Sequence, residues 1–123
     1  MQMPEPDAAI IARKGRIVAR LRAVLPPDAV IDDAGELRVY ECDALAAYRC
    51  PPLAAVLPRT TAEVSAILRI ASEEGVPVVP RGSGTSLAGG AMPTADSLIL
   101  GVAVLVSGAG TNQGVDFINE ENY

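Results

Sequence analysis

The sequence predicts an α/β fold of the α+β type, with an N-terminal amphipathic helix followed by a βαβ unit. Three observations predict it. An apolar stripe of helical period runs from residue 10 to 25, and a strand, helix, strand pattern fills residues 53–79. A glycine-rich loop follows the second of these strands directly. In open α/β sheets such a loop lies at the carboxyl edge, where ligands bind.

The composition limits what this chain can be. Its 123 residues suffice for one domain of ordinary size, and 50% of them are hydrophobic, as in globular proteins. A net charge of −5 has the wrong sign for nucleic acid as a partner. The longest apolar run, 98–106, is about half of the roughly 20 residues that cross a bilayer, so no transmembrane segment is expected. Since the first residues show neither a signal nor a transit pattern, we expect a cytoplasmic protein.

The N-terminal helix is predicted over residues 10–25. Pro26 and Pro27 end it, because proline lacks the amide that a helix needs. Its second face is basic, and we expect that face to be solvated; a surface for a membrane or an acidic partner is the alternative. The apolar stripe consists of Ile10, Ile17, Leu21 and Val24, with Ile11, Val18 and Leu25 beside it. The basic face consists of Arg13, Lys14, Arg16, Arg20 and Arg22.

Residues 27–52 are predicted to form an irregular connector. A turn is expected at 32–35, and Pro51-Pro52 excludes regular strand pairing before the next element. The stretch 40–49 mixes acids, aromatic residues and a thiol without any period, which by itself indicates a packed loop. Cys42 and Cys50 stand alone in a chain without histidine, so neither a metal site nor a redox motif is expected.

The βαβ unit begins with a strand at 53–57. Thr60 and Glu63 form a capping-box signature for a helix, and Gly75 is suited to end it in the left-handed conformation. The buried face of this helix is predicted to hold Val64, Ile67, Leu68 and Ala71. A second strand at 76–79 should run parallel to the first. A third strand is predicted from residue 97 to 101 or on to 106, buried on both faces, and residues 104–123 are expected to be a loosely ordered tail.

The loop after the second strand carries the chemistry. Glycines at 82, 84, 89 and 90 let backbone amides approach a ligand, and successive amides form a concave site for an anion. A diphosphate there could bind the amides of 82–86 and the hydroxyl groups of Ser83, Thr85 or Ser86, with Arg81 screening its charge. The spacing is neither the dinucleotide fingerprint nor a Walker loop. A plain glycine-rich connector is the alternative.

Pro-Arg-Gly-x-Gly-Thr-x-Leu-x-Gly-Gly-x-x-Pro, from Pro80 to Pro93, resembles the flavin-diphosphate loop of the FAD-linked oxidases, the vanillyl-alcohol-oxidase superfamily with its PCMH-type FAD-binding domain. Within that group, Tyr40-Glu41-Cys42-Asp43-x-Leu-x-Ala-Tyr48-Arg49, with Pro52-Leu53 and 56–58 after it, resembles the FAD-binding subunits of bacterial glycolate oxidases. The match covers residues 26–103.

This resemblance implies a cofactor, FAD, and a set of residues that bind it. The implied set places Pro58 near the adenine end, the amides of 82–86 on the diphosphate and Gly90 close to the cofactor; the cofactor-binding residues are Pro58, Arg81, Gly82, Ser83, Gly84, Thr85, Ser86 and Gly90. It divides the chain into an N-terminal helix and connector (1–50), the first half of an FAD-binding domain (51–103) and a divergent tail (104–123). It implies a parent enzyme that oxidises glycolate or another 2-hydroxy acid by hydride transfer to FAD. Its partners would be further glycolate oxidase subunits, one of them an iron–sulfur subunit through which the enzyme could associate with a membrane.

The sequence departs from this family after Ala103. The family continues into the second half of the flavin domain and a substrate domain, whereas this chain turns to Val104-Leu105-Val106-Ser107, so a truncated or frame-shifted product is expected. The isolated chain is then predicted to be inactive, to bind FAD weakly or not at all, and to contribute no catalytic residue. A dinucleotide fingerprint at 108–114 is disfavoured, because too few residues follow it. The alternative function is a non-catalytic module that binds a phosphorylated ligand or another protein.

Overall fold

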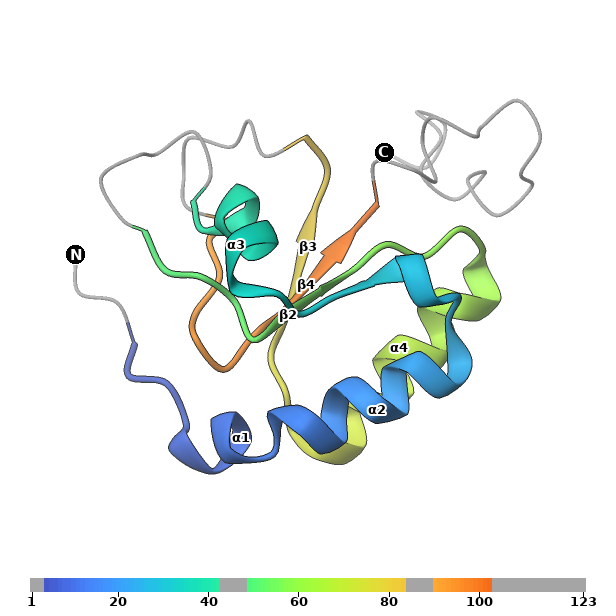
Figure 1. The fold of residues 1–123 in the computed structure, drawn as a ribbon, viewed down its shortest axis with the longest axis horizontal. Helices are drawn as coiled ribbons and strands as arrows, with labels where there is room; N and C mark the ends of the chain where they lie inside the picture. Colours follow the sequence, from blue (N-terminus) through green and yellow to red (C-terminus); the bar gives the residue numbers. More distant parts are fainter. Residues whose placement is uncertain (1–3, 43–48, 84–89, 103–123) are drawn as a thin grey trace.

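The computed structural model describes residues 4–42, 49–83 and 90–102, and forms a small sheet with helices on both faces (Figure 1). In chain order the elements are α1 (Ala8–Ala12), α2 (Lys14–Val24), the 3₁₀ turn η1 (Pro27–Ala29), β1 (Val30–Ile31), α3 (Ala34–Leu37), the 3₁₀ turn η2 (Arg38–Tyr40), β2 (Ala54–Val56), α4 (Thr61–Glu74), β3 (Val78–Arg81) and β4 (Leu98–Gly101). The α/β fold predicted from the sequence is confirmed.

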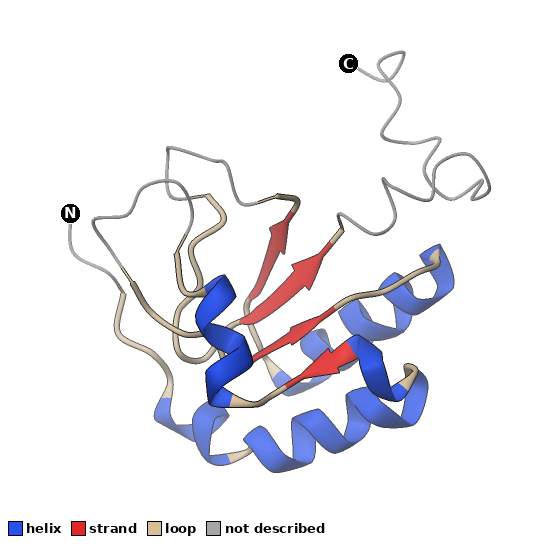
Figure 2. Cartoon of the chain, turned by 45° about the horizontal axis from the view of Figure 1, so that its top comes forward, coloured by secondary structure: helices blue, strands red, loops and turns tan. Residues whose placement is uncertain are grey.

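The sheet has four strands in the order β1-β2-β4-β3. Strand β4 lies between β2 and β3 and is parallel to both, with Ala55 and Val79 opposite Ile99 on its two sides (Figure 2). Strand β1 pairs antiparallel with β2 at the other edge. The predicted strands are therefore parallel, but the third strand is inserted between the two strands of the βαβ unit.

One face of the sheet carries the main core. Because side chains alternate along a strand, Leu98 and Leu100 of β4 point to this face together with Ala54 and Val56 of β2. Helices α1, α2 and α4 cover it, and Figure 1 shows them along one side of the sheet. Their most deeply buried side chains are Ile17, Leu21 and Ile67. These apolar contacts hold the helical layer to the sheet.

The opposite face has a smaller core. Ile99 and Ala55 are fully buried there beneath Leu37 of α3, and Tyr40 and Val79 pack against them. All four residues of β4 are buried, as the apolar run without polar alternation predicts. The short segment α3–η2 thus covers the same face as Val79, which places it next to the end of β3.

The N-terminal helix is divided into two. The sequence predicted one helix over 10–25, but α1 ends at Ala12, and α2 begins at Lys14 after Arg13 with φ −94° and ψ 9°. Gly15, a weak helix former, lies just after this break. The predicted stop at the two prolines is confirmed, while two members of the predicted apolar stripe, Ile11 and Val24, are exposed.

Helix α4 has the predicted ends. The Thr60 side chain accepts a hydrogen bond from the amide of Glu63 at 3.1 Å, and Gly75 adopts a left-handed conformation with φ 69°. The predicted buried face is wrong at one position, because Leu68 is 45% exposed and Ile70 is buried instead. The helix is rotated slightly relative to the stripe that the sequence indicated.

Two further expectations need correction. The connector 27–52 is not wholly irregular, since Val30 and Ile31 form the edge strand β1 and Asp33 caps α3. The second strand of the βαβ unit lies at Val78–Arg81 and not at 76–79. That shift of two residues brings Pro80 and Arg81 into the sheet, so the glycine-rich loop begins directly at Gly82.

Candidate functional site

The candidate site lies at the edge of the sheet where the three parallel strands end. Because β2, β3 and β4 run in one direction, their carboxyl ends at Val56, Arg81 and Gly101 lie along one edge. In an open α/β sheet this edge is the usual place for a ligand. Pro58, Gly82 and Ser83 follow the ends of β2 and β3, so the fold brings these predicted residues to the same edge.

The described residues of the glycine-rich loop are open to solvent. Gly82, Ser83 and Gly90 are exposed, and a Cβ built at Gly82 would meet no atom within 4 Å. Gly82 does not have a positive φ, so the backbone conformation does not require a glycine there. The open space leaves room for a ligand beside Gly82. Gly84, Thr85 and Ser86 lie outside the described residues.

Arg81 occupies the last position of β3, and its half-buried side chain turns toward the connector. It follows Val79 by two residues and therefore points to the face that η2 covers. Its Nη1 donates to the carbonyl oxygen of Cys42 at 2.6 Å and its Nη2 to that of Val39 at 3.4 Å. Its Cζ lies 5.6 Å from the centre of the Tyr40 ring. The guanidinium thus binds the connector.

Pro58 follows β2 and is fully buried. Nearby, Gly101 makes a close approach to the same segment, since a Cβ on it would lie 2.6 Å from Cδ2 of Leu57. The two strand ends are therefore packed against each other without space for another atom. Pro58 is therefore part of the buried interior beside this edge of the sheet.

The connector closes on itself beside the site. The amide of Cys50 donates to the carbonyl oxygen of Glu41 at 2.8 Å, and Arg49 lies 3.3 Å from the Glu41 carboxylate. These contacts bring residues 41 and 50 together from either side of 43–48. Most of the packed loop predicted at 40–49, residues 43–48, lies outside the described residues. Burial raises the pKa of the Cys50 thiol above its ordinary value, which keeps that thiol protonated at neutral pH.

A buried ion-pair cluster lies on the helical side of the sheet. Glu74, at the end of α4, accepts hydrogen bonds from Arg16 at 2.8 Å, from Arg20 at 2.9 Å and from Arg13 at 3.2 Å. The Glu74 side chain is 2% exposed. Hydrogen bonds from Arg16 above all, and then from Arg20 and Arg13, hold the pKa of Glu74 below its ordinary value against the opposing effect of its desolvation.

This cluster was missed by the sequence analysis, which expected the basic face of α2 to be solvated. The one hint in the sequence is the pair Glu73-Glu74 at the end of a helix, where acidic residues are disfavoured by the helix dipole. Such residues suggest a partner elsewhere. The expectation of a solvated face is therefore wrong for Arg13 and Arg20, which are partly buried, whereas Arg16 pairs with Glu74 and is still 63% exposed.

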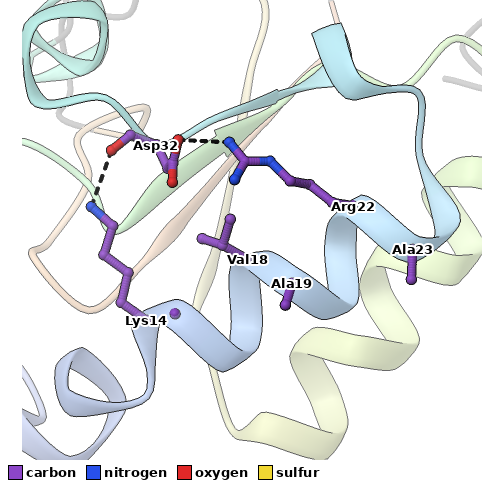
Figure 3. A pocket seen from close by; sticks show the side chains of 7 residues that line it. Lys14, Val18, Ala19, Arg22, Ala23 and Asp32 are labelled. Carbon is purple, nitrogen blue, oxygen red and sulfur yellow. Dashed lines mark hydrogen bonds and ion pairs between the residues drawn. The ribbon is translucent and has the colours of Figure 1, made fainter.

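A hollow lies away from the strand ends. It measures about 690 Å³ and is bounded by Lys14, Gly15, Val18, Ala19, Arg22, Ala23 and Asp32 on α2 and just after β1. Both cations are bound to Asp32: Lys14 to its carbonyl oxygen at 3.2 Å and Arg22 to its carboxylate at 2.7 Å (Figure 3). Among the residues that line the hollow, therefore, no unpaired cation is left for an anionic ligand.

Neither a metal site nor a membrane span emerges from the described residues. Within 4–42, 49–83 and 90–102, no three His, Cys, Asp or Glu side chains come close enough to hold a metal ion. Among these same residues, no helix is long and apolar enough to cross a bilayer.

Comparison with known proteins gives consistent matches. The model of a family described as "FAD binding domain" matches residues 52–105. Glycolate oxidase subunit GlcD of Escherichia coli (strain K12) is 41% identical over 87 residues, which are 71% of this chain and 17% of that protein. The protein of the same name from Bacillus subtilis (strain 168) is 53% identical over 68 residues, or 55% of this chain and 14% of that protein.

The fold also matches solved structures. An alkyldihydroxyacetonephosphate synthase aligns with a TM-score of 0.63 and 19% identity over 82% of this chain and 20% of that one. At this identity the likeness concerns the fold. The chain spans 17% of the Escherichia coli relative and 14% of the Bacillus subtilis relative.

Proposed function

We propose that the chain forms the diphosphate-binding part of an FAD site, because the model described as "FAD binding domain" matches its residues 52–105. The proposed cofactor-binding residues are Pro58, Gly82, Ser83, Gly84, Thr85, Ser86 and Gly90, and Arg81 stands beside them at the end of β3. The observation that carries the proposal is the open space at the exposed Gly82, directly after a strand and at the carboxyl edge of the sheet. Backbone amides there can donate to phosphate oxygens with no side chain in the way.

The parent activity that we propose is the oxidation of glycolate or a related 2-hydroxy acid. Bound FAD supplies the acceptor for the hydride. This chain supplies binding and orientation: the loop holds the diphosphate, and the buried ends of β2 and β4 give it a rigid base. The identity of 41% to a glycolate oxidase subunit supports this substrate class. We further propose an iron–sulfur subunit as the partner that accepts electrons, and a cytoplasmic location with membrane association through such partners.

The isolated chain is proposed to lack oxidase activity and to bind FAD weakly. It contains no histidine that could serve as the base for the substrate hydroxyl. It also covers a small part of the relatives, so most contacts to a flavin ring would come from other sequence.

Two glycine variants test the binding site. Gly82→Ala places a methyl group where the ligand-free chain has open space, so we expect the free energy of unfolding to stay within about 0.5 kcal/mol of wild type. The same methyl group would obstruct a diphosphate, and FAD affinity should fall about tenfold or more. Isothermal calorimetry and urea unfolding measure the two quantities.

Gly15→Ala is the matched control, because a Cβ at Gly15 on α2 also meets no atom within 4 Å. This variant should leave FAD affinity unchanged. Equal affinities for wild type and Gly82→Ala would contradict the proposed site, and so would a loss of affinity in Gly15→Ala of the same size.

A further inference from the structure

We propose that Arg81 is a positioning residue of the cofactor site: its guanidinium holds residues 39–42 against the end of β3, where the glycine-rich loop begins. This role replaces direct screening of the diphosphate by the same side chain. It rests on the proposed function for its link to FAD. The contact itself rests on the geometry of the chain alone.

The backbone of Arg81 is fixed by the sheet. Arg81 lies opposite Gly101 in the register of β3 and β4, and its carbonyl oxygen accepts from the amide of Val102 at 2.8 Å. The next residue, Gly82, has left the strand. Arg81 is therefore the point at which the rigid sheet passes into the loop.

The side chain reaches the connector with a geometry that suits arginine. Two nitrogens of one planar group bind two carbonyl oxygens, those of Cys42 and Val39, and the same guanidinium lies over the Tyr40 ring. Arginine presents several donors in a fixed plane and stacks on aromatic rings. Lysine, with a single ammonium group, cannot make this set of contacts. The Val39 carbonyl oxygen belongs to η2, and Cys42 lies two residues after the end of η2.

The connector in turn is tied to the core and to the segment that leads into β2. Tyr40 packs on the small core formed by Leu37, Ala55 and Ile99, and the carbonyl oxygen of Glu41 binds the amide of Cys50. Without the Arg81 contacts, residues 39–42 would open more easily, while both core clusters stay intact. A weaker FAD affinity would then come from the loosened connector and not from a lost ligand of the phosphates.

Nuclear magnetic resonance of the whole chain, labelled with ¹⁵N, tests this role in the absence of FAD. In Arg81→Gln and Arg81→Lys, the amides of Glu41 and Cys50 should exchange with solvent about tenfold faster, because local opening becomes easier. The amides of Ile99 and Leu100 in the central strand should keep their exchange rates. Arg49→Gln is the control, since Arg49 binds Glu41 from an exposed position, 64% accessible. Unchanged exchange at Glu41 and Cys50 in both Arg81 variants would overturn the proposal.

Titration with FAD separates positioning from direct contact. We expect Arg81→Gln and Tyr40→Leu each to weaken FAD binding about tenfold, and the double variant to be no weaker than either, because both remove the same support. The dependence of FAD affinity on ionic strength should stay as in wild type. Additive losses, or a weaker salt dependence in Arg81→Gln, would show direct pairing with phosphate and contradict the role. A wild-type chain without FAD binding would contradict the proposed function, whereas amide exchange would still decide whether Arg81 holds the connector.

Discussion

Gly101 and Leu57 show how closely single residues are fitted at the strand ends. A Cβ built on residue 101 would lie 2.6 Å from Cδ2 of Leu57 and 3.4 Å from the carbonyl oxygen of Val56. Glycine at 101 therefore serves packing, since its φ is not positive. At Gly75 the reason is the opposite: space is open, but the left-handed backbone with φ 69° disfavours any side chain.

Gly101→Ala should destabilise the protein by about 1 kcal/mol, because the half-buried Leu57 side chain must shift to make room. Urea unfolding measures the change. Leu57→Ala removes the obstructing atoms, so adding it to Gly101→Ala should cost less than adding it to wild type. Strictly additive effects of the two substitutions would show that the side chain of Leu57 does not limit residue 101.

At the scale of elements, Glu74 joins α4 to the N-terminal helices. Its carboxylate binds Arg13 at the break between α1 and α2, and Arg16 and Arg20 on α2. A buried carboxylate that has such partners is stable as an anion. A substitution that removes its charge leaves three guanidinium groups without their common partner. The cluster thereby fixes how the helices lie on one another.

Stability should depend on pH through Glu74 in a defined direction. Its folded pKa lies below the ordinary value of 4.5, so the unfolded chain binds the proton first as the pH falls. The stabilising contribution is complete above about pH 5 and is lost as the pH falls through 4.5 toward the folded pKa. The difference in free energy of unfolding between wild type and Glu74→Gln should therefore shrink from pH 6 to about pH 3.

Glu73→Gln provides the control for this measurement. Glu73 also pairs with Arg20, but its side chain is 51% exposed, and exposed pairs contribute little. Urea unfolding of the three proteins at several pH values gives the comparison. A difference between wild type and Glu74→Gln that stays constant with pH would be incompatible with a lowered pKa.

The elements differ in how well the sequence predicts them. The ends of α4 are predicted correctly, because Thr60, Glu63 and Gly75 act on neighbouring backbone groups. Strand β1 was missed, since two residues show no alternation. Leu68 was placed in the core, although the packing against α2 turns Ile70 inward instead. The Glu74 cluster joins residues 54 to 61 positions apart, which no local pattern shows.

For the candidate site, the sequence predicted the loop, its position after a strand, and the residue types that bind a diphosphate. It could not show that Arg81 turns toward residues 39–42, because this contact depends on the register of β3 and on the path of the connector. It also gave no reason to expect Pro58 inside the core. Local chemistry is visible in the sequence, whereas the direction of a side chain depends on the fold.

At the scale of the whole molecule, the two core clusters lie on opposite faces of the sheet. The larger cluster holds α1, α2 and α4 on one face of the sheet, and the smaller one holds α3 and η2 on the other. The carboxyl edge of β2, β4 and β3 lies between these layers (Figure 2). A hollow is formed by α2 and the residue after β1, away from this edge. The proposed FAD site is at the carboxyl edge and not in the hollow.

The central claim is that FAD binds at this carboxyl edge. The most direct measurement is a titration of the ¹⁵N-labelled chain with FAD, following the backbone amide signals. We predict saturable shifts at Gly82, Ser83 and Gly90, with the amides of Gly15, Ala19 and Ala23 beside the hollow unchanged. Shifts centred on the hollow, or no shifts at millimolar FAD, would contradict the claim.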